Sequence, residues 1–247
     1  CNICSFNLAE LCNTTIALMK DAKHDISTTM PAPDFVGGGQ ILYDEAQMRE
    51  IYEYGRGSVK VRARYSVVPG ENMIEITQIP PTTTVEAIMD KIAELVKAGK
   101  IKEISDMRDE TDLNGLKLTL DLKRGVDAEK LMAKLFKTTP LEDSFSANFN
   151  VLVSGQPRVM GVREILQEWT AFRMECVRRR TYYDLHGKEK RLHLLKGLAA
   201  ILLDIDKAIH IIRTTEEETE VVPNLMIGFG IDEVQADYVA EIKLRHL

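Results

Sequence analysis

The sequence predicts an α+β fold, in which a domain with a mixed sheet precedes a long helix. A second helix is predicted to return along the long one, so that the two form an antiparallel coiled coil. Between residues 58 and 153, short stretches with a hydrophobic period of two alternate with amphipathic, capped helices, which is typical of a sheet covered by helices on one side. Between Pro157 and Pro223 there is no proline, and apolar residues recur at alternating three- and four-residue steps. The chain has 247 residues, 45% of them hydrophobic, so it is long enough to bury a sizeable core.

The first 57 residues predict two helices separated by a bend. Asn7 and Glu10 have the spacing of a capping box, which predicts a helix that continues through residue 19. A proline-rich and glycine-rich run at 31–39 predicts a sharp bend and the first candidate domain boundary. A short helix is expected over 44–54, ending at the glycines that follow. The buried side of the first helix is expected to consist of Leu8, Leu11, Thr15 and Leu18.

A basic strand is expected over residues 58–68. Its apolar residues alternate with Lys60, Arg62 and Arg64, so one face is predicted to be buried while three cations line the other. A turn at 69–72 and a returning strand at 73–79 complete a hairpin.

The remaining helices and strands of the α+β part are predicted from helix caps and hydrophobic periodicity in the same way. Thr83 and Glu86 predict the start of a helix over 84–98, which ends at Gly99. Strands are expected at 101–107, 116–122 and 148–153. A helix is expected at 127–137.

One helix of about 50 residues is predicted over 162–213, too long for a compact domain to cover. Its middle is basic, with seven Arg or Lys against three Asp or Glu over 173–191. Asp232 is expected to open a second, returning helix that stops in mid-pattern at residue 247. Together with a first residue that is not methionine, this suggests a piece of a longer protein.

Patterns for small-molecule chemistry are weak. The glycine run at 37–39 lacks the strand and the lysine of a phosphate-binding loop, and no Ser-His-Asp or Cys-His arrangement stands out. Cys1 and Cys4 form a lone C-x-x-C, for which inert thiols are favoured over a metal or redox role. An acidic loop at 106–112 fits a Mg²⁺ site or, more simply, a polar turn that pairs with Arg108. We therefore expect no catalytic residue and no metal ligand here, and we expect His186 and His193 to be solvated.

The basic strand is the better functional indication. The cations of residues 60–64 have no carboxylate among them, which suits a line of phosphates, whereas an ordinary solvated sheet face explains the alternation equally well. The three arginines at 178–180 fit contact with nucleic acid or pairing with carboxylates on neighbouring helices. The net charge of −6 argues against a protein that coats DNA generally, although local patches decide contact.

Several longer motifs resemble the breakage-reunion subunit of bacterial type IIA DNA topoisomerases, the family of gyrase and topoisomerase IV A subunits. The resemblance covers essentially the whole chain in order. The motifs are Pro31-Ala-Pro33-Asp34-Phe35, Tyr54-Gly55-Arg56-Gly57-Ser58, Lys91-Ile92-Ala93-Glu94-Leu95-Val96, Ile104-Ser105-Asp106-Met107-Arg108-Asp109-Glu110, Val177-Arg178-Arg179-Arg180-Thr181 and His193-Leu194-Leu195-Lys196-Gly197-Leu198.

The resemblance implies a division into four parts. Residues 1–30 would be the end of a winged-helix domain with its connecting helix, and 31–157 an α+β tower domain. Residues 158–215 would be the long coiled-coil helix, and 216–247 a small helical gate or dimerisation segment with the start of the return helix.

The resemblance also implies roles for residues. The tower would hold the arms of a bent gate DNA, with Ile3 at the place of an isoleucine that wedges between base pairs. The other DNA contacts would be Arg56, Lys60, Arg62 and Arg64. The dimer contact would comprise Val234, Tyr238 and Ile242.

At the level of the whole protein, the resemblance implies an ATP-dependent DNA topoisomerase in the cytoplasm, away from membranes. Its partners would be double-stranded DNA and, in a heterotetramer, ATPase B subunits with a second copy of the A subunit. Mg²⁺ and ATP would be held by the partner subunit. The tyrosine that attacks a DNA phosphate in the family has no counterpart in residues 1–247, so this chain alone is expected to be inactive.

Two departures from the family and one rival interpretation remain. Cys4-Ser5 stands where the family has two prolines, and Val36-Gly37 stands where Pro-Thr is common, so the wedge loop is expected to be less rigid. The rival is a non-enzymatic coiled-coil scaffold or adaptor whose α+β head binds protein and shows no salt-dependent affinity for DNA.

Overall fold

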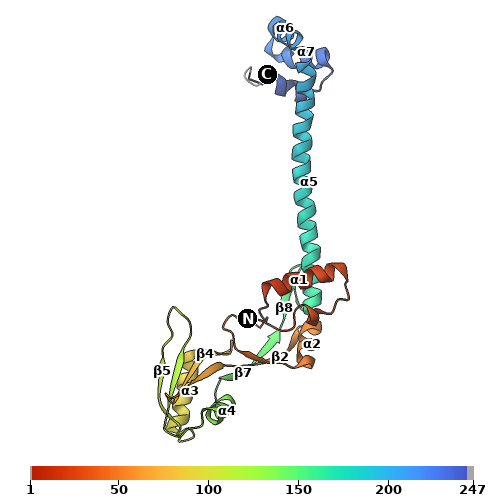
Figure 1. Ribbon diagram of the computed structural model, residues 1–247. Coiled ribbons are helices and arrows are strands. Elements are labelled where there is room, and N and C mark those ends of the chain that lie inside the picture. The colour runs from red at the N-terminus through yellow and green to blue at the C-terminus, as the bar shows by residue number, and fades with distance from the viewer. Residues whose placement is uncertain (1, 244–247) are drawn as a thin grey trace. The chain divides into compact units, whose positions relative to one another are not determined.

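The computed structural model describes residues 2–243, and the chain divides into two compact units, Cys1–Ala171 and Phe172–Leu247 (Figure 1). The helices of unit 1 are α1 (Leu8–Lys20), η1 (Ile26–Thr28, a 3-10 turn), α2 (Glu45–Tyr54), α3 (Val85–Lys97) and α4 (Ala128–Thr138). Its strands are β1 (Gln40–Leu42), β2 (Arg56–Arg62), β3 (Arg64–Val68), β4 (Met73–Gln78), β5 (Ile104–Asp109), β6 (Leu118–Leu122), β7 (Glu142–Asn148), β8 (Asn150–Val153) and β9 (Gln156–Val159). The division falls inside α5 (Val162–Leu202), and unit 2 also contains α6 (Ile205–Thr214), α7 (Glu218–Phe229) and α8 (Glu233–Ala240).

The α+β class is confirmed, but the expectation of a mixed sheet is wrong for the described residues. The strands form sheet A in the order β1-β2-β7, sheet B in the order β3-β4-β6-β5 and a hairpin of β8 with β9, and every pairing is antiparallel. A crossover through α3 from β4 to β5 would make parallel neighbours if the two strands were adjacent. Here β6 lies between them and runs opposite to both.

The basic strand predicted over 58–68 is two strands in two different sheets. The ladder of β2 ends at Arg62, and β3 begins at Arg64 in sheet B. Between them Ala63 is fully buried, and its N–H donates to the carbonyl of Leu141 at 2.7 Å. The chain therefore passes from one sheet to the other at this residue.

Two separate cores stabilise unit 1. The first lies between sheet B and helices α3 and α4 (Figure 1), and its fully buried members include Ile74, Ile76, Ile88, Ile92, Leu118, Leu120, Met132 and Leu135. The second joins α1, α2, the apolar face of sheet A and the first turns of α5, and includes Met30, Ile51, Val59, Val61, Phe149 and Leu166. Both cores form where apolar faces are buried. In the helices these faces repeat every 3.6 residues, and in the strands they repeat every two residues.

Side-chain caps start the helices of unit 1, as local sequence predicts. The Asn7 side chain accepts from the N–H groups of Ala9 and Glu10, and the Asp44 side chain caps α2 in the same way. The cap of α3 is Thr84 and not Thr83, because the Thr84 hydroxyl accepts from the Ala87 N–H at 3.3 Å. The expected burial of Leu8 is wrong, since its side chain is 73% exposed.

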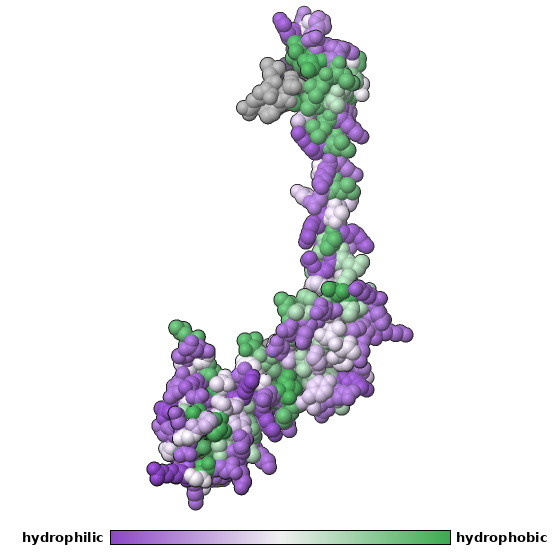
Figure 2. Space-filling model, in the orientation of Figure 1, coloured by the Kyte–Doolittle hydropathy of each residue, from purple (hydrophilic) through white to green (hydrophobic). Residues whose placement is uncertain are grey.

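The predicted helix over 162–213 is broken after Leu202. Asp204 adopts a non-helical backbone conformation, and its side chain accepts from the Lys207 N–H at 3.1 Å, so it caps a new helix, α6. Residues 177–193 of α5 are all exposed, and no described helix covers them as a coiled-coil partner. In Figure 2 polar and apolar side chains are interspersed along this stretch.

Unit 2 has a small core of its own, formed by Ile201, Ala208, Leu225, Ala236 and Val239. The segment 216–231 contains α7, which carries Pro223 inside it. An internal proline removes one helical hydrogen bond, so helix propensity argues against this element, and packing of Leu225 into the core outweighs it. No helix in the described part of the chain combines the length and hydropathy that crossing a membrane requires.

Candidate nucleic-acid interface

The candidate site is the solvent-facing side of sheet A, here called the polar face. Antiparallel register places side chains of paired residues on the same side of a sheet. The pairs Arg62↔Glu142, Lys60↔Ser144, Ser58↔Ser146 and Arg56↔Asn148 therefore share this face. β1 adds Gln40 opposite Arg62 and Leu42 opposite Lys60. The other side of β2, with Val59 and Val61, is buried in the second core.

A tight junction at Gly55 sets the start of β2. Gly55 ends α2 in the left-handed conformation at φ 71°, and its carbonyl accepts from the Phe149 N–H at 2.8 Å. Residue 55 must be a glycine, because the Cβ of any other residue would lie 2.1 Å from the Met160 carbonyl oxygen. The Gln47 side chain then accepts from the Ser58 N–H at 2.9 Å. These bonds fix where the polar face begins.

The structure pairs part of the predicted cation row with a carboxylate. Arg62 Nε donates to Glu142, and Lys60 Nζ lies 3.9 Å from the same carboxylate. The Arg62 guanidinium also lies over the Phe136 ring, 5.0 Å from its centroid. Glu142 is 80 residues from Arg62 in sequence, so the expectation of an unmixed row fails through long-range strand pairing.

Arg64 does not continue the row of β2. It is the first residue of β3 in sheet B, where it pairs with Gln78 next to a β-bulge. Its exposed side chain and that of Arg56 have no ion-pair partner among the described residues. In the same region, burial and a hydrogen bond to Glu129 raise the pKa of Tyr65 to about 12, so this phenol stays neutral at physiological pH.

Ile3 lies near the Arg56 end of the polar face. The Asn148 N–H donates to the Asn2 carbonyl at 2.7 Å, while Asn148 is also the ladder partner of Arg56. The Ile3 side chain is 37% exposed, and the next residue, Cys4, is buried. Burial raises the pKa of the Cys4 thiol to about 12, which fits the expectation of an inert thiol. The structure thus places the main chain just before Ile3 at the Arg56 end of sheet A.

Sequence reasoning missed the contribution of β7. Its Ser144, Ser146 and Asn148 are exposed beside the cations of β2. The signal in the sequence is a weak alternation of these residues with Phe145 and Ala147, which are more buried. With so few apolar residues, the segment does not stand out as a strand.

The acidic segment 106–112, expected to be a loop, begins within β5 and takes part in an ion-pair network. Arg108 lies 3.5 Å from Asp106 and 3.1 Å from Glu110, and it also donates to Asp121. Lys117 reaches Glu110 at 3.2 Å. Hydrogen bonds from Arg108 and Lys117 lower the pKa of Glu110. The pairing with Arg108 considered from sequence is confirmed, and no group of three or more His, Cys, Asp or Glu within residues 2–243 has a geometry suited to a metal ion.

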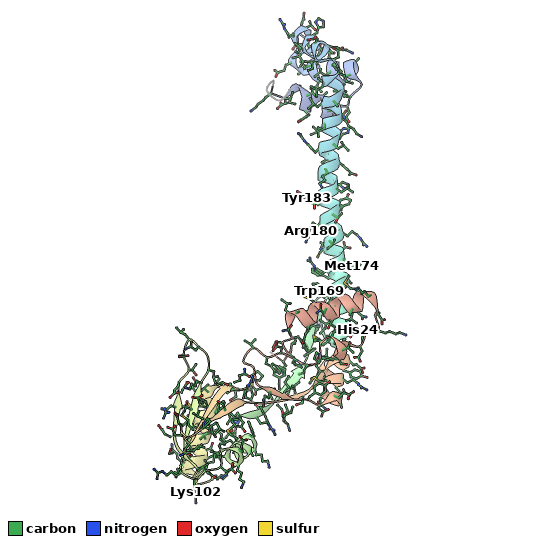
Figure 3. All side chains as sticks on the ribbon, in the orientation of Figure 1. His24, Lys102, Trp169, Met174, Arg180 and Tyr183 are labelled. Atoms are coloured by element: carbon green, nitrogen blue, oxygen red, sulfur yellow. The ribbon has the colours of Figure 1, made fainter. Side chains whose placement is uncertain are left out.

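The basic stretch of α5 pairs mainly within its own helix. Arg178 lies 3.4 Å from Glu175, and Arg179 lies 3.9 Å from it. Arg180 and Tyr183 project from α5 (Figure 3). Such exposed pairs contribute little to stability, so they leave this surface available for other contacts.

The predicted dimer-contact residues lie in or just after α8. Val234 is 61% exposed, Tyr238 is half-buried and receives a hydrogen bond from Arg191 at 3.0 Å, and Ile242 follows the end of the helix. The residues of α8 that are buried within unit 2 are Gln235, Ala236 and Val239. Residues 244–247 of the expected return helix lie outside the described residues.

A polar contact holds α8 to α5 within unit 2. His193 Nε2 lies 2.5 Å from Asp232, and the Gln235 amide donates to the His193 carbonyl at 2.8 Å. The Gln235 N–H, and after it His193, lower the pKa of Asp232. His193 is exposed, as expected, and its ring additionally pairs with Asp232.

The chain is similar to known proteins over its whole length. The family model for the A subunits of DNA gyrase and topoisomerase IV matches residues 1–247. The gyrase A subunit of Synechocystis is 36% identical over 256 residues, covering 100% of this chain and 30% of the relative. The topoisomerase 4 A subunit of Salmonella typhimurium is 38% identical over 247 residues, covering 98% of this chain and 32% of the relative. The chloroplastic/mitochondrial gyrase A subunit of Arabidopsis thaliana is 35% identical, covering 100% of this chain and 27% of the relative.

Proposed function

The chain belongs to the family of DNA gyrase and topoisomerase IV A subunits, and we propose that it supplies a DNA-binding surface to a type II DNA topoisomerase. The chain spans about a third of the length of its curated relatives, so the activity proposed is that of a longer protein. That protein would act in the cytoplasm on double-stranded DNA as an ATP-dependent enzyme. It would work with B subunits that hold Mg²⁺ and ATP, and with a second copy of the A subunit.

The observation that supports a DNA-binding role is the composition of the polar face. It carries Arg56, Lys60 and Arg62 against one carboxylate, Glu142. At about 3.3 Å per residue the three cations span about 20 Å of strand, a length that matches about six base-pair steps of 3.4 Å. Exposed cations that follow a line of phosphates supply most of the affinity of proteins for DNA. We include Arg64 as a contact beyond the face, on β3.

In this proposal the chain binds and bends DNA but does not cut it. Ile3 would insert between base pairs at the Arg56 end of the polar face, where its partial exposure leaves the side chain accessible. Val234, Tyr238 and Ile242 would contact the second copy of the A subunit. The nucleophilic tyrosine would be supplied from outside residues 1–247.

Charge neutralisation on the polar face should lower the salt dependence of DNA binding. We expect the chain to bind a duplex of about 30 base pairs with a steep fall in affinity as salt rises. Arg56→Gln/Lys60→Gln should reduce the slope of log K against log salt by about 0.9 for each phosphate that is no longer neutralised. Fluorescence anisotropy of a labelled duplex between about 0.05 and 0.2 M salt measures this slope.

A matched control is Lys97→Gln/Lys100→Gln, which changes the same charge at exposed positions at the end of α3. The control should keep the wild-type slope, and the duplexes recovered from each titration should be intact. Absence of salt-dependent binding by the unaltered chain would contradict the proposal and favour a protein-binding scaffold. An equal effect of both variants would place the DNA elsewhere.

Removing the one carboxylate of the polar face should tighten DNA binding. Glu142→Gln frees Arg62 and Lys60 from their ion pairs, and we expect a gain of about twofold to fivefold at low salt, in keeping with the modest energy of such pairs. Glu75→Gln, which removes one of the two carboxylates paired with Lys117 beside sheet B, is the matched control and should change affinity less. The same anisotropy titration gives both values, and a loss of affinity in Glu142→Gln would show that Glu142 orients Arg62 for binding.

A further inference from the structure

We propose that Ser144, Ser146 and Asn148, here called the β7 donors, form a second row of contacts on the polar face. In this arrangement their hydroxyl and amide groups donate hydrogen bonds to phosphate or sugar oxygens of a duplex, next to the phosphates paired by the cations of β2. The inference rests on the proposed DNA-binding function and deepens it. In this arrangement the cations of β2 supply most of the affinity for DNA. The β7 donors fix the position of the duplex on the sheet.

Register places each β7 donor beside a residue of β2. Ser144 is the ladder partner of Lys60, and Asn148 is the ladder partner of Arg56. Between them, Ser146 pairs with Ser58, which adds another exposed hydroxyl. Neighbouring strands are about 4.8 Å apart, so the two rows run side by side on the same side of the sheet. A DNA backbone that follows the cations passes within reach of the β7 donors.

The β7 donors also have free hydrogen-bonding capacity. All three side chains are exposed, and none makes a side-chain hydrogen bond to another described residue. Some other exposed serines of unit 1, by contrast, are used internally. Ser5 donates to the Asp34 carbonyl at 2.7 Å, and Ser105 donates to the Asp121 carbonyl at 3.1 Å. Contacts from hydroxyl and amide side chains to the DNA backbone are common and fix register, without carrying charge.

Charge is distributed unevenly along the polar face, and this decides where the duplex lies. Glu142 neutralises the end that carries Arg62. The opposite end combines Arg56, which has no described ion-pair partner, with Asn148. The Asn148 N–H also holds the Asn2 carbonyl, so the main chain before Ile3 is tied to the same end. The carboxylate-free end therefore combines hydrogen-bond donors and a cation with the main chain that leads into Ile3.

The test separates neutral contacts from charged ones. Ser144→Ala/Ser146→Ala should weaken binding of the 30-base-pair duplex about fivefold at every salt concentration, because two neutral hydrogen bonds are removed. The slope of log K against log salt should stay at the wild-type value, since no cation is removed. Ser144→Thr/Ser146→Thr keeps both hydroxyls and suits a strand, so it should restore the affinity. The matched control, Ser66→Ala/Thr77→Ala, removes two exposed hydroxyls from sheet B and should keep the wild-type affinity.

Each other outcome decides against the inference in a recognisable way. If the unaltered chain binds with a steep slope and the alanine variant binds equally well, the β7 donors are not contacts and the proposed function stands. If the alanine variant loses slope as well as affinity, its effect comes through the cations. If the threonine variant does not recover, the hydroxyls are not the binding groups. If the unaltered chain shows no salt-dependent binding, the inference and the proposed function fail together.

Discussion

Gly161→Ala should destabilise unit 1 by about 3 kcal/mol, because the added Cβ has no room. It would lie 2.3 Å from the Glu53 carbonyl oxygen and 2.5 Å from the Tyr52 carbonyl oxygen. These are main-chain atoms at the end of α2, so they cannot rotate away as a flexible side chain would. Urea unfolding followed by fluorescence of Trp169, the single tryptophan of the chain, measures the change.

Gly187→Ala provides the control for this substitution. Gly187 lies in the exposed part of α5, and a Cβ added there would meet no atom within 4 Å, so alanine should favour the helix by about 1 kcal/mol. The same chemical change is thus expected to act with opposite sign at the two sites. Equal midpoints for Gly161→Ala and the unaltered chain would refute the close approach of residue 161 to α2.

Phe149→Ala should cost unit 1 about 3–5 kcal/mol, the range for removing a buried aromatic ring. Phe149 is 1% exposed, and its ring meets that of Phe6 edge-on at a centroid distance of 6.3 Å. Its main chain also bonds to Gly55 and Met160. Because the second core supports sheet A, the variant should lose DNA affinity along with stability. Thermal unfolding and the anisotropy titration measure the two effects.

Leu152→Ala, three residues further on, is the matched control for Phe149→Ala. Leu152 is 74% exposed, so its truncation should change the free energy of unfolding by less than about 0.5 kcal/mol. A similar loss in both variants would mean that the β8–β9 hairpin, and not the ring of Phe149, accounts for the stability. Retained DNA affinity in a destabilised Phe149→Ala would mean that the polar face does not depend on the second core.

The sequence predicts where helices begin, but it does not predict the order of the strands in the sheets. Caps such as Asn7 and Asp44 act within three residues, so sequence spacing alone locates the helix starts. The antiparallel sheets depend on β6 lying between β4 and β5, which no local pattern encodes. The sequence does not predict the break of the long helix, because the apolar residues before and after Asp204 keep their helical spacing. The break becomes visible only in the structure, where the Asp204 side chain caps α6.

The candidate site divides in the same way. The alternation of residue types in β2 predicts that Val59 and Val61 lie on the buried side of the strand. It therefore also predicts that Lys60 and Arg62 lie on the solvent-facing side. The pairing of Arg62 with Glu142 and the presence of the β7 donors follow from a ladder between residues far apart in sequence. Pairing of distant strands is set by tertiary packing, so a single sequence does not reveal it.

Exposure of residues 177–190 has a consequence for how the chain withstands proteases. Every residue of this part of α5 is exposed, and its side chains make no hydrogen bond or ion pair with another described element. It keeps its helix through main-chain bonds, and unsupported helical segments of this length open frequently in water. Arg178, Arg179 and Arg180 lie within it, so trypsin would find three adjacent cleavage sites there. Brief digestion would cut this stretch first and release two resistant pieces, one that keeps the two cores of unit 1 and one that keeps the core of unit 2.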